Sequence, residues 1–379
     1  MKLTYFLRPK DNLKLLAKKG VSEVIIGTLD HSRLGEFNSQ QAIEAAKLAK
    51  SLGLKTVLLC DALVGQREFD SFAKSLSEMT PFFDAARALD PGVMQFLFDH
   101  TDIALHFVAD TGNHNLVGLK AWEDYFADRL ERIVLSIELS KESLNHIIPK
   151  LKTPCELLVL GRILLFHSPR ALLSPLSGEA SDQSWIDAVG ASEESPHKGF
   201  PLVENKQGSF MFLAKDFCLA EQLKDLRDMK LDFMRLDPTG CEPEVALKVV
   251  DDLLSDQPEK AKDSWPNLVI RGFYGVNKSD VLFKKLKNPS RDKTHAIAEV
   301  LDTRKGDPVT VRVLDGAKLH SGMKIEMVSP DGKKKQIELK WIRDLNGNNL
   351  EQANENMIVS LPPIGSATCK ALIFDVNNL

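Results

Sequence analysis

The sequence has 379 residues, of which 43% are hydrophobic and 27% are charged, and its formal net charge is −4. This length predicts two domains, and the composition is that of an ordinary globular protein. The acidic balance excludes a general attraction of the whole chain to nucleic acid or to anionic membranes, so such binding would need a local basic patch.

The lack of an apolar signal-peptide stretch and the unpaired cysteines predict a cytoplasmic protein. The opening residues, MKLTYFLRPKDN, contain no apolar stretch of signal-peptide length. No apolar run approaches the roughly 18 residues that a membrane span requires. The five scattered cysteines are odd in number and form no CxxC pair, which fits a reducing compartment; they are Cys60, Cys155, Cys218, Cys241 and Cys369.

Short apolar runs alternate with amphipathic stretches over residues 1–290. The apolar runs predict strands at residues 3–7, 23–27, 56–60, 103–108, 133–136, 156–160, 210–213 and 233–236. Between them, stretches such as QQAIEAAKLAKSLG carry apolar residues three and four positions apart and predict helices. This alternation predicts an α/β domain of parallel βαβ units, and eight strands suit a (β/α)8-type barrel. An open doubly wound sheet is the alternative, since periodicity does not show closure.

The segment at about 174–200 interrupts this alternation. It is rich in serine, glycine, alanine and acidic residues, which predicts a long loop or a partly disordered insertion. Its tryptophan, Trp185, is expected to anchor the insertion against the barrel rather than to contact a partner.

Residues 291–379 have a different pattern. Alternating apolar runs are separated by Asp315-Gly316, Asp331-Gly332 and Asn346-Gly347, which are strong hairpin signals. We therefore expect a small antiparallel β-barrel domain here. The stretch DGKKKQIELK places three lysines at a turn, where they are either solvated or in contact with RNA phosphates.

Common catalytic and metal-binding motifs are missing from the sequence. It contains no GxSxG, HExxH, GxxxxGK[ST] or strand-following GxGxxG segment. His106, Asp110 and His114 come closest to a metal site, but their spacing does not fix a complete ligand set, so no metal is expected.

In a (β/α)8 barrel, functional residues lie where strands end and the following loops begin. These positions hold Arg8, Lys10, Asp30, Arg33, Asp61, Asp110, Asn115, Glu138, Arg162, Arg170, Lys215, Asp216, Arg235 and Asp237. The arginines suit an anionic small molecule or a nucleotide phosphate. Asp110 and Glu138 are candidates for acid–base catalysis, with Asp237 as a third. The alternative is that these residues form structural ion pairs and helix caps.

Several segments resemble the collagenase-like peptidase family U32, in chain order over nearly the whole sequence. SRLGEFNSQQAIEAAKLAKSLGLKTVLL resembles its RAGNFS loop with the following helix and strand, and VLSIELSKESL resembles VLSRELSLEEI. FMFLAKDFCLAEQL resembles the SKDLCLI region, and MRLDPTG stands where the family has KIEGR. The resemblance implies a barrel and, as in many members, a small C-terminal β-barrel. Despite the family's name, its better-understood members look like oxygen-independent hydroxylases that act on RNA bases or quinone precursors and carry an iron–sulfur cluster.

The sequence departs from that family at the cluster cysteines. Two ligands in the family's HGALCMAYSGRC segment are matched by Leu164 and Ala171, and the next cysteine segment falls in the insertion, which has no cysteine. Cys218 alone matches a remaining ligand position. Because one thiolate does not hold a four-iron cluster, we expect no iron–sulfur cluster and no other cofactor.

The resemblance implies that a binding pocket is retained. Matching residues are Arg33, Gly35, Asn115, Glu138, Arg170, Lys215 and Asp216, while Arg235 and Asp237 keep the charges of a family Lys and Glu. One hypothesis is a U32 hydrolase, or a cluster-free variant, that binds an anionic small molecule, a peptide or nucleic acid at the barrel mouth. The alternative is a pseudoenzyme: a partner subunit or RNA-binding accessory protein that forms a heteromer with a cluster-bearing hydroxylase. A translation-associated factor acting through the β-barrel is a third hypothesis, and catalysis stays open.

Overall fold

The computed structural model describes residues 1–110, 112–177, 185–191, 198–275, 295–304, 306–330, 332–365 and 367–378. The chain forms two compact units, Met1–Asn277 and Lys278–Leu379. Among these described residues, no helix is long and apolar enough to cross a membrane.

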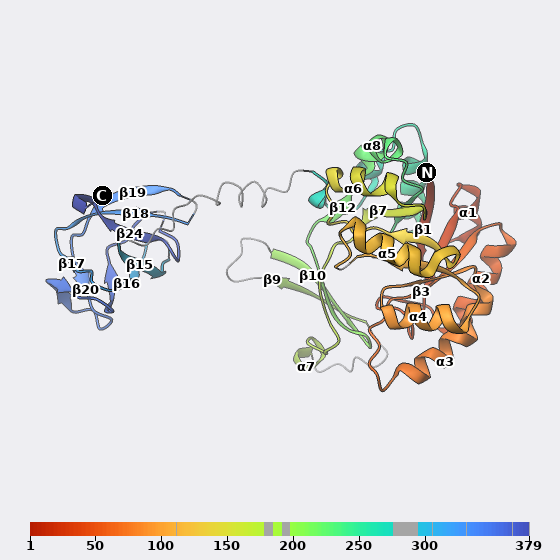
Figure 1. The fold of residues 1–379 in the computed structure, drawn as a ribbon, viewed down its shortest axis with the longest axis horizontal. Helices are drawn as coiled ribbons and strands as arrows, with labels where there is room; N and C mark the ends of the chain where they lie inside the picture. The colour runs from red at the N-terminus through yellow and green to blue at the C-terminus, as the bar shows by residue number, and fades with distance from the viewer. Residues whose placement is uncertain are drawn as a thin grey trace. The chain divides into compact units, whose positions relative to one another are not determined.

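Eight parallel strands close into a barrel in the first unit (Figure 1). They are β1 (Lys2–Leu7), β2 (Glu23–Gly27), β3 (Lys55–Cys60), β4 (Ala85–Ala88), β5 (Ala104–Val108), β6 (Leu130–Val134), β7 (Cys155–Gly161) and β13 (Phe233–Leu236). The first seven pair in chain order, and β13 pairs with both β7 and β1, so the ring closes. The predicted (β/α)8-type barrel is confirmed, and the open-sheet alternative is wrong.

Helices surround this barrel (Figure 1). They are α1 (Leu13–Lys18), α2 (Ser39–Ser51), α3 (Phe69–Met79), α4 (Pro91–His100), α5 (Leu116–Phe126), α6 (Lys141–Ile147), α8 (Leu223–Asp228), α9 (Pro243–Leu254) and α10 (Lys260–Ser264). Local sequence sets several of their ends. Asn38 and Gln41 form a reciprocal capping box at the start of α2, and Asp90 caps α4 directly before Pro91.

A second sheet shows that the strand predicted at 210–213 is not a barrel strand and that part of the loop predicted at 174–200 is a strand. It consists of β8 (Leu164–Ser168), β9 (Ile186–Ala191), β10 (Lys198–Asn205) and β11 (Gly208–Phe212), in the antiparallel order β8-β11-β10-β9. The strand expected at 210–213 therefore belongs to this sheet, whereas the barrel uses β4, which the prediction missed.

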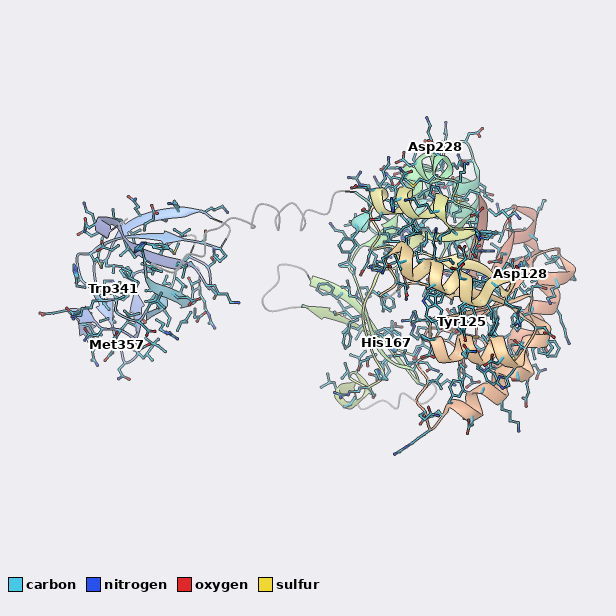
Figure 2. The ribbon with its side chains drawn as sticks, viewed as in Figure 1. Tyr125, Asp128, His167, Asp228, Trp341 and Met357 are labelled. Atoms are coloured by element: carbon cyan, nitrogen blue, oxygen red, sulfur yellow. The ribbon has the colours of Figure 1, made fainter. Side chains whose placement is uncertain are left out.

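The insertion at 174–200 is also more ordered than expected where the structure describes it. It contains α7 (Ser174–Ser177), β9 and the first residues of β10, while 178–184 and 192–197 lie outside the described residues. Trp185 packs on the apolar cluster of this sheet, formed by Val203, Phe210 and Phe212, whereas the prediction had it anchored against the barrel. His167, labelled in Figure 2, stacks on Phe210 with 4.4 Å between ring centroids.

The second unit is an antiparallel β domain. Its main sheet has the order β19-β18-β24-β15-β16-β23-β20-β21. The bounds are β15 (Ala296–Asp302), β16 (Val309–Val313), β18 (Lys324–Val328), β19 (Lys334–Glu338), β20 (Ile342–Arg343), β21 (Asn349–Leu350), β23 (Ile358–Leu361) and β24 (Leu372–Asp375), with β17 (Leu319–His320) paired to β22 (Gln352–Ala353). Alternate residues such as Val300, Val311, Ile325 and Ile373 form one apolar core, which confirms the predicted fold class of this domain.

A buried ion network fills part of the barrel interior. The fully buried carboxylate of Glu156 accepts hydrogen bonds from Arg87 Nη1 and Nη2 at 2.7 and 2.5 Å, and from Arg132 Nη1 at 2.9 Å. Arg132 also donates to the two carboxylate oxygens of Glu23, at 3.3 and 3.1 Å. Because buried charges are costly without partners, these contacts are a condition for closing the barrel around them.

A second buried carboxylate fixes the insertion to its sheet. Glu204 on β10 accepts hydrogen bonds from the backbone N–H groups of Leu172, Leu173 and Ser174, at 2.5, 2.7 and 2.9 Å. The hydroxyl of Ser209 donates a further bond at 2.5 Å. Burial opposes ionisation of Glu204, but these hydrogen bonds outweigh it and lower its pKa to about 2.

Glu204 should make the first unit sensitive to acid. Since its pKa is lower in the folded state than in the unfolded chain, where it is about 4.3, its contribution is present above about pH 4.3 and is lost as the pH falls towards 2. We expect Glu204→Gln to lower the free energy of unfolding at pH 7 by about 1–3 kcal/mol and to flatten its pH dependence. Urea unfolding between pH 7 and pH 3 measures both effects. Glu142→Gln, at an exposed position on α6, is the control, and identical curves for Glu204→Gln and wild type would contradict the assignment.

Candidate functional site

The candidate site lies at the carboxyl ends of the barrel strands, which is where (β/α)8 barrels carry their functional residues. Of the predicted residues, two form a neutralised pair, two have unused donors, several have structural partners, and Glu138, Arg170 and Lys215 are exposed.

The neutralised pair is Arg33 and Asp61, after β2 and β3. Arg33 Nε lies 2.9 Å from Asp61 Oδ2, and its backbone N–H donates to Asp61 Oδ1 at 3.0 Å. Burial disfavours the charged guanidinium, but Asp61 outweighs burial and raises the pKa of Arg33, with a smaller contribution from Asp110. The loop also requires Gly35, since a Cβ there would lie 2.1 Å from the carbonyl oxygen of Thr28. Arg33 is thus held in an ion pair.

The second group lies at the neighbouring ends of β7 and β13. Arg235 Nη1 is 3.6 Å from Glu156 Oε1, and the Arg235 side chain is 18% exposed. Arg162 lies over the ring of Phe212 at 5.4 Å and passes close to Gly240, where a Cβ would be 2.2 Å from its Nη2. Within the part of the chain that the structure describes, neither guanidinium has a hydrogen-bond acceptor. Their N–H groups are therefore available to a ligand.

Asp237 follows Arg235 and also lies at this end of the barrel. Its backbone N–H donates to the carbonyl oxygen of Leu160 on β7, at 2.9 Å. Its Oδ1 accepts hydrogen bonds from the backbone N–H and the hydroxyl of Thr239, at 3.0 and 2.6 Å. These contacts order the loop after β13 next to the two arginines.

The charges of the buried network do not cancel. Three arginines, Arg87, Arg132 and Arg235, face the two carboxylates of Glu23 and Glu156. Burial opposes ionisation of Glu156, but Arg87 and then Arg235 lower its pKa, so Glu156 is ionised. Burial raises the pKa of Glu23, although Arg132 opposes that shift.

His106, beside this network, adds no compensating charge or partner. Burial, then Arg132 and Arg87, lower its pKa well below the usual range, so the imidazole is neutral. Arg235 is consequently the solvent-accessible part of a network with at least one surplus positive charge. Such a guanidinium suits a phosphate or a carboxylate.

The remaining predicted residues have other surroundings. Asn115 caps α5, its Oδ1 accepting from Gly118 N at 2.8 Å. Asp216 is buried on β12 (Asp216–Cys218) and accepts from Trp265 Nε1 and Asn267 Nδ2 at 2.7 and 2.9 Å. Glu138, Arg170 and Lys215 are exposed. The structure thus gives Asn115 and Asp216 structural partners.

Sequence reasoning missed Arg87, Arg132 and Glu156, which lie inside strands rather than at their ends. A usable signal was present, because each is a charged residue within a short apolar run: AARA, LERIV and CELLVLG. A charge at such a position in a barrel strand must find a partner across the interior.

The cysteines do not form a cluster site. Cys60, Cys155, Cys218 and Cys241 are buried, and burial raises the thiol pKa of each, to about 12 for Cys155 and Cys241. No group of three or more His, Cys, Asp or Glu residues that could hold a metal occurs in the described ranges. The donors available there do not fit an iron–sulfur cluster, which takes several thiolates.

The two positions that match cluster cysteines lie in the second sheet and its loop. Leu164, on β8, is half-buried, and Ala171 is exposed. His106 is fully buried within the barrel, and His114 Nε2 lies 3.4 Å from the backbone carbonyl oxygen of Asp110.

In the second unit, the basic hairpin is partly neutralised. Lys334 Nζ lies 2.9 Å from Glu326 Oε1, which accounts for one of its three lysines. Contact between this hairpin and RNA stays a prediction.

Comparison with known proteins identifies the family. The family model for Peptidase family U32 matches residues 9–260. The tRNA hydroxylation protein P2 of Bacillus subtilis (strain 168) is 23% identical over 269 residues, covering 66% of this chain and 86% of that protein. The U32 peptidase Mk0906 is 13% identical, with a TM-score of 0.34 over 43% of this chain and 70% of its own. A xylose isomerase domain protein from Planctomyces limnophilus is 12% identical, with a TM-score of 0.37; the match covers 69% of this chain and 98% of that protein. Since the family model spans more than half of the sequence, the chain belongs to peptidase family U32.

Proposed function

We propose that this protein binds RNA at the barrel mouth and takes part in tRNA hydroxylation without holding an iron–sulfur cluster of its own. The observation that carries the proposal is Arg235. Its only ion-pair partner within the described ranges is Glu156, which is already bound by Arg87 and Arg132. The guanidinium at the mouth is therefore only partly neutralised and can bind a phosphate.

RNA is the anionic ligand that the surroundings favour. The chain as a whole is acidic, so attraction of RNA depends on local cations such as Arg235 on β13, which pairs in register with Leu158 of β7, and Arg162, which follows the end of β7. Arg162 already lies over an aromatic ring, and such planar surfaces also suit nucleobases. The similarity to a tRNA hydroxylation protein supports tRNA as the substrate class.

The proposed role is that of an RNA-binding partner of a cluster-bearing family member. Hydroxylation transfers electrons, so a redox centre has to act in the reaction. Four of the five cysteines are buried with raised thiol pKa values, and the described residues contain no group of three or more metal-binding side chains, so we assign that centre to a second protein. Asp110, Glu138 and Asp237 then shape the mouth, and no acid–base step is assigned to them.

Replacing Arg235 should weaken RNA binding. We expect Arg235→Gln to raise the dissociation constant for a tRNA anticodon stem-loop roughly tenfold, since one phosphate contact is lost. The slope of log affinity against log salt concentration should become shallower by about one for the same reason. Fluorescence anisotropy at several salt concentrations measures both. Lys74→Gln, an exposed charge removal on α3, should change little. Equal affinities of Arg235→Gln and wild type, with both proteins folded by circular dichroism, would rule out the mouth as the RNA site.

The absence of a cluster is tested by purification under anaerobic conditions, followed by iron and acid-labile sulfide analysis. We expect iron far below one four-iron cluster per chain, because a single candidate thiolate does not hold such a cluster. About four iron atoms per chain, lost in Cys218→Ala, would overturn the cluster-free assignment.

A further inference from the structure

A charged hollow lies at the end of the barrel where the strands begin, opposite the candidate site. It measures about 500 Å³, and its lining includes Lys2 from β1, Pro154 before β7, Phe233 on β13, and the segment after α8. This volume is in the range of small-molecule sites. It is separate from the mouth described above, and a ligand there would bind independently of the proposed function.

Three basic side chains line this hollow: Lys2, Arg227 and Lys230. In the described part of the chain, none of them forms an ion pair; Lys2 Nζ lies 5.7 Å from the centre of the Phe233 ring. Asp232 also lines the hollow, but its Oδ2 accepts a hydrogen bond from the backbone N–H of Cys155 at 2.9 Å. The hollow thus holds three unpaired cations beside one engaged carboxylate.

The backbone at Lys230 is a second, independent observation. Lys230 has φ of 63°, the left-handed conformation that favours glycine. Gly20 and Gly53 have positive φ values after α1 and α2, so glycine takes this position after two other helices of the barrel. A lysine in this conformation carries a conformational cost, and such residues occur preferentially at functional positions.

Stabilisation of the helix is the simpler explanation for some of these cations. Positive side chains near the C-terminus of α8, whose last residue Asp228 is labelled in Figure 2, interact favourably with the helix dipole. That effect explains Arg227 and Lys230. It does not explain Lys2, which comes from another element, or the choice of lysine over glycine at position 230.

We propose that this hollow binds the phosphate of a nucleotide, with Lys2, Arg227 and Lys230 around the phosphate. Pro154 and Phe233 provide an apolar surface for the ribose and base. The phosphate belongs either to a free mononucleotide or to an RNA backbone, and the two sources share the same recognition chemistry.

The test uses the full chain and two substitutions. Lys230→Gly removes a charge while giving position 230 the residue that its backbone favours, so loss of binding is not a consequence of misfolding. Arg227→Gln removes a second charge. Lys370→Gly is the matched control, because Lys370 is exposed, has φ of 67° and lies in the other unit.

The probes are AMP, measured by calorimetry, and a labelled uridine pentanucleotide, measured by fluorescence anisotropy. We expect Lys230→Gly and Arg227→Gln each to weaken binding roughly threefold to tenfold and to reduce its salt dependence, while Lys370→Gly has no effect. Binding of AMP that competes with the pentanucleotide identifies a mononucleotide site, and binding of the pentanucleotide alone identifies an RNA backbone site. Failure of wild type to bind either probe, or binding that neither substitution weakens, would overturn the proposal.

Discussion

The buried contacts of Glu156 with Arg87 and Arg132 are the interaction on which the barrel and its mouth depend. They connect β7 with β4 and β6, and Arg132 extends the connection to Glu23 on β2. Breaking such a pair leaves a buried charge without a partner, which typically costs about 3–5 kcal/mol. The network therefore fixes which strands face one another across the interior and where Arg235 lies.

The same network accounts for the positive charge of the mouth. Two carboxylates shared among three arginines leave positive charge at the one arginine that reaches solvent. Arg33 shows the contrast, because Asp61 binds it through two hydrogen bonds and neutralises it. Binding of an anion is consequently expected on the β7 and β13 side of the mouth, beside Arg162.

The sequence predicts the strands with the longer apolar runs well and misses β4, whose four residues AARA include an arginine. Residues 3–7 and 156–160 read clearly as strands, but AARA does not, because it is short and its arginine pairs with a residue 69 positions away. The described part of the segment at 174–200 contributes β9 and the start of β10 to the second sheet because Val203, Phe210 and Phe212, outside the segment, form an apolar cluster against which Trp185 packs. No local pattern contains that information.

The candidate site shows the same limit. Counting residues from strand ends selects Arg162, Arg235 and Asp237, and the structure places Arg162 after β7, Arg235 within β13 and Asp237 directly after β13. It also selects Asn115, whose side chain caps α5, and Asp216, whose side chain accepts a hydrogen bond from Trp265. Position along a strand is readable from sequence, whereas the partner of a side chain depends on the tertiary structure.

The central claim is that surplus positive charge from the barrel interior is exposed at Arg235. Anomalous diffraction from crystals of the full chain soaked in selenate, a tetrahedral dianion similar to phosphate, tests it most directly. The account predicts a selenium peak within hydrogen-bonding reach of the Arg235 guanidinium, and its disappearance in Arg235→Gln. Ordered selenate at other cations with none at the mouth would contradict it.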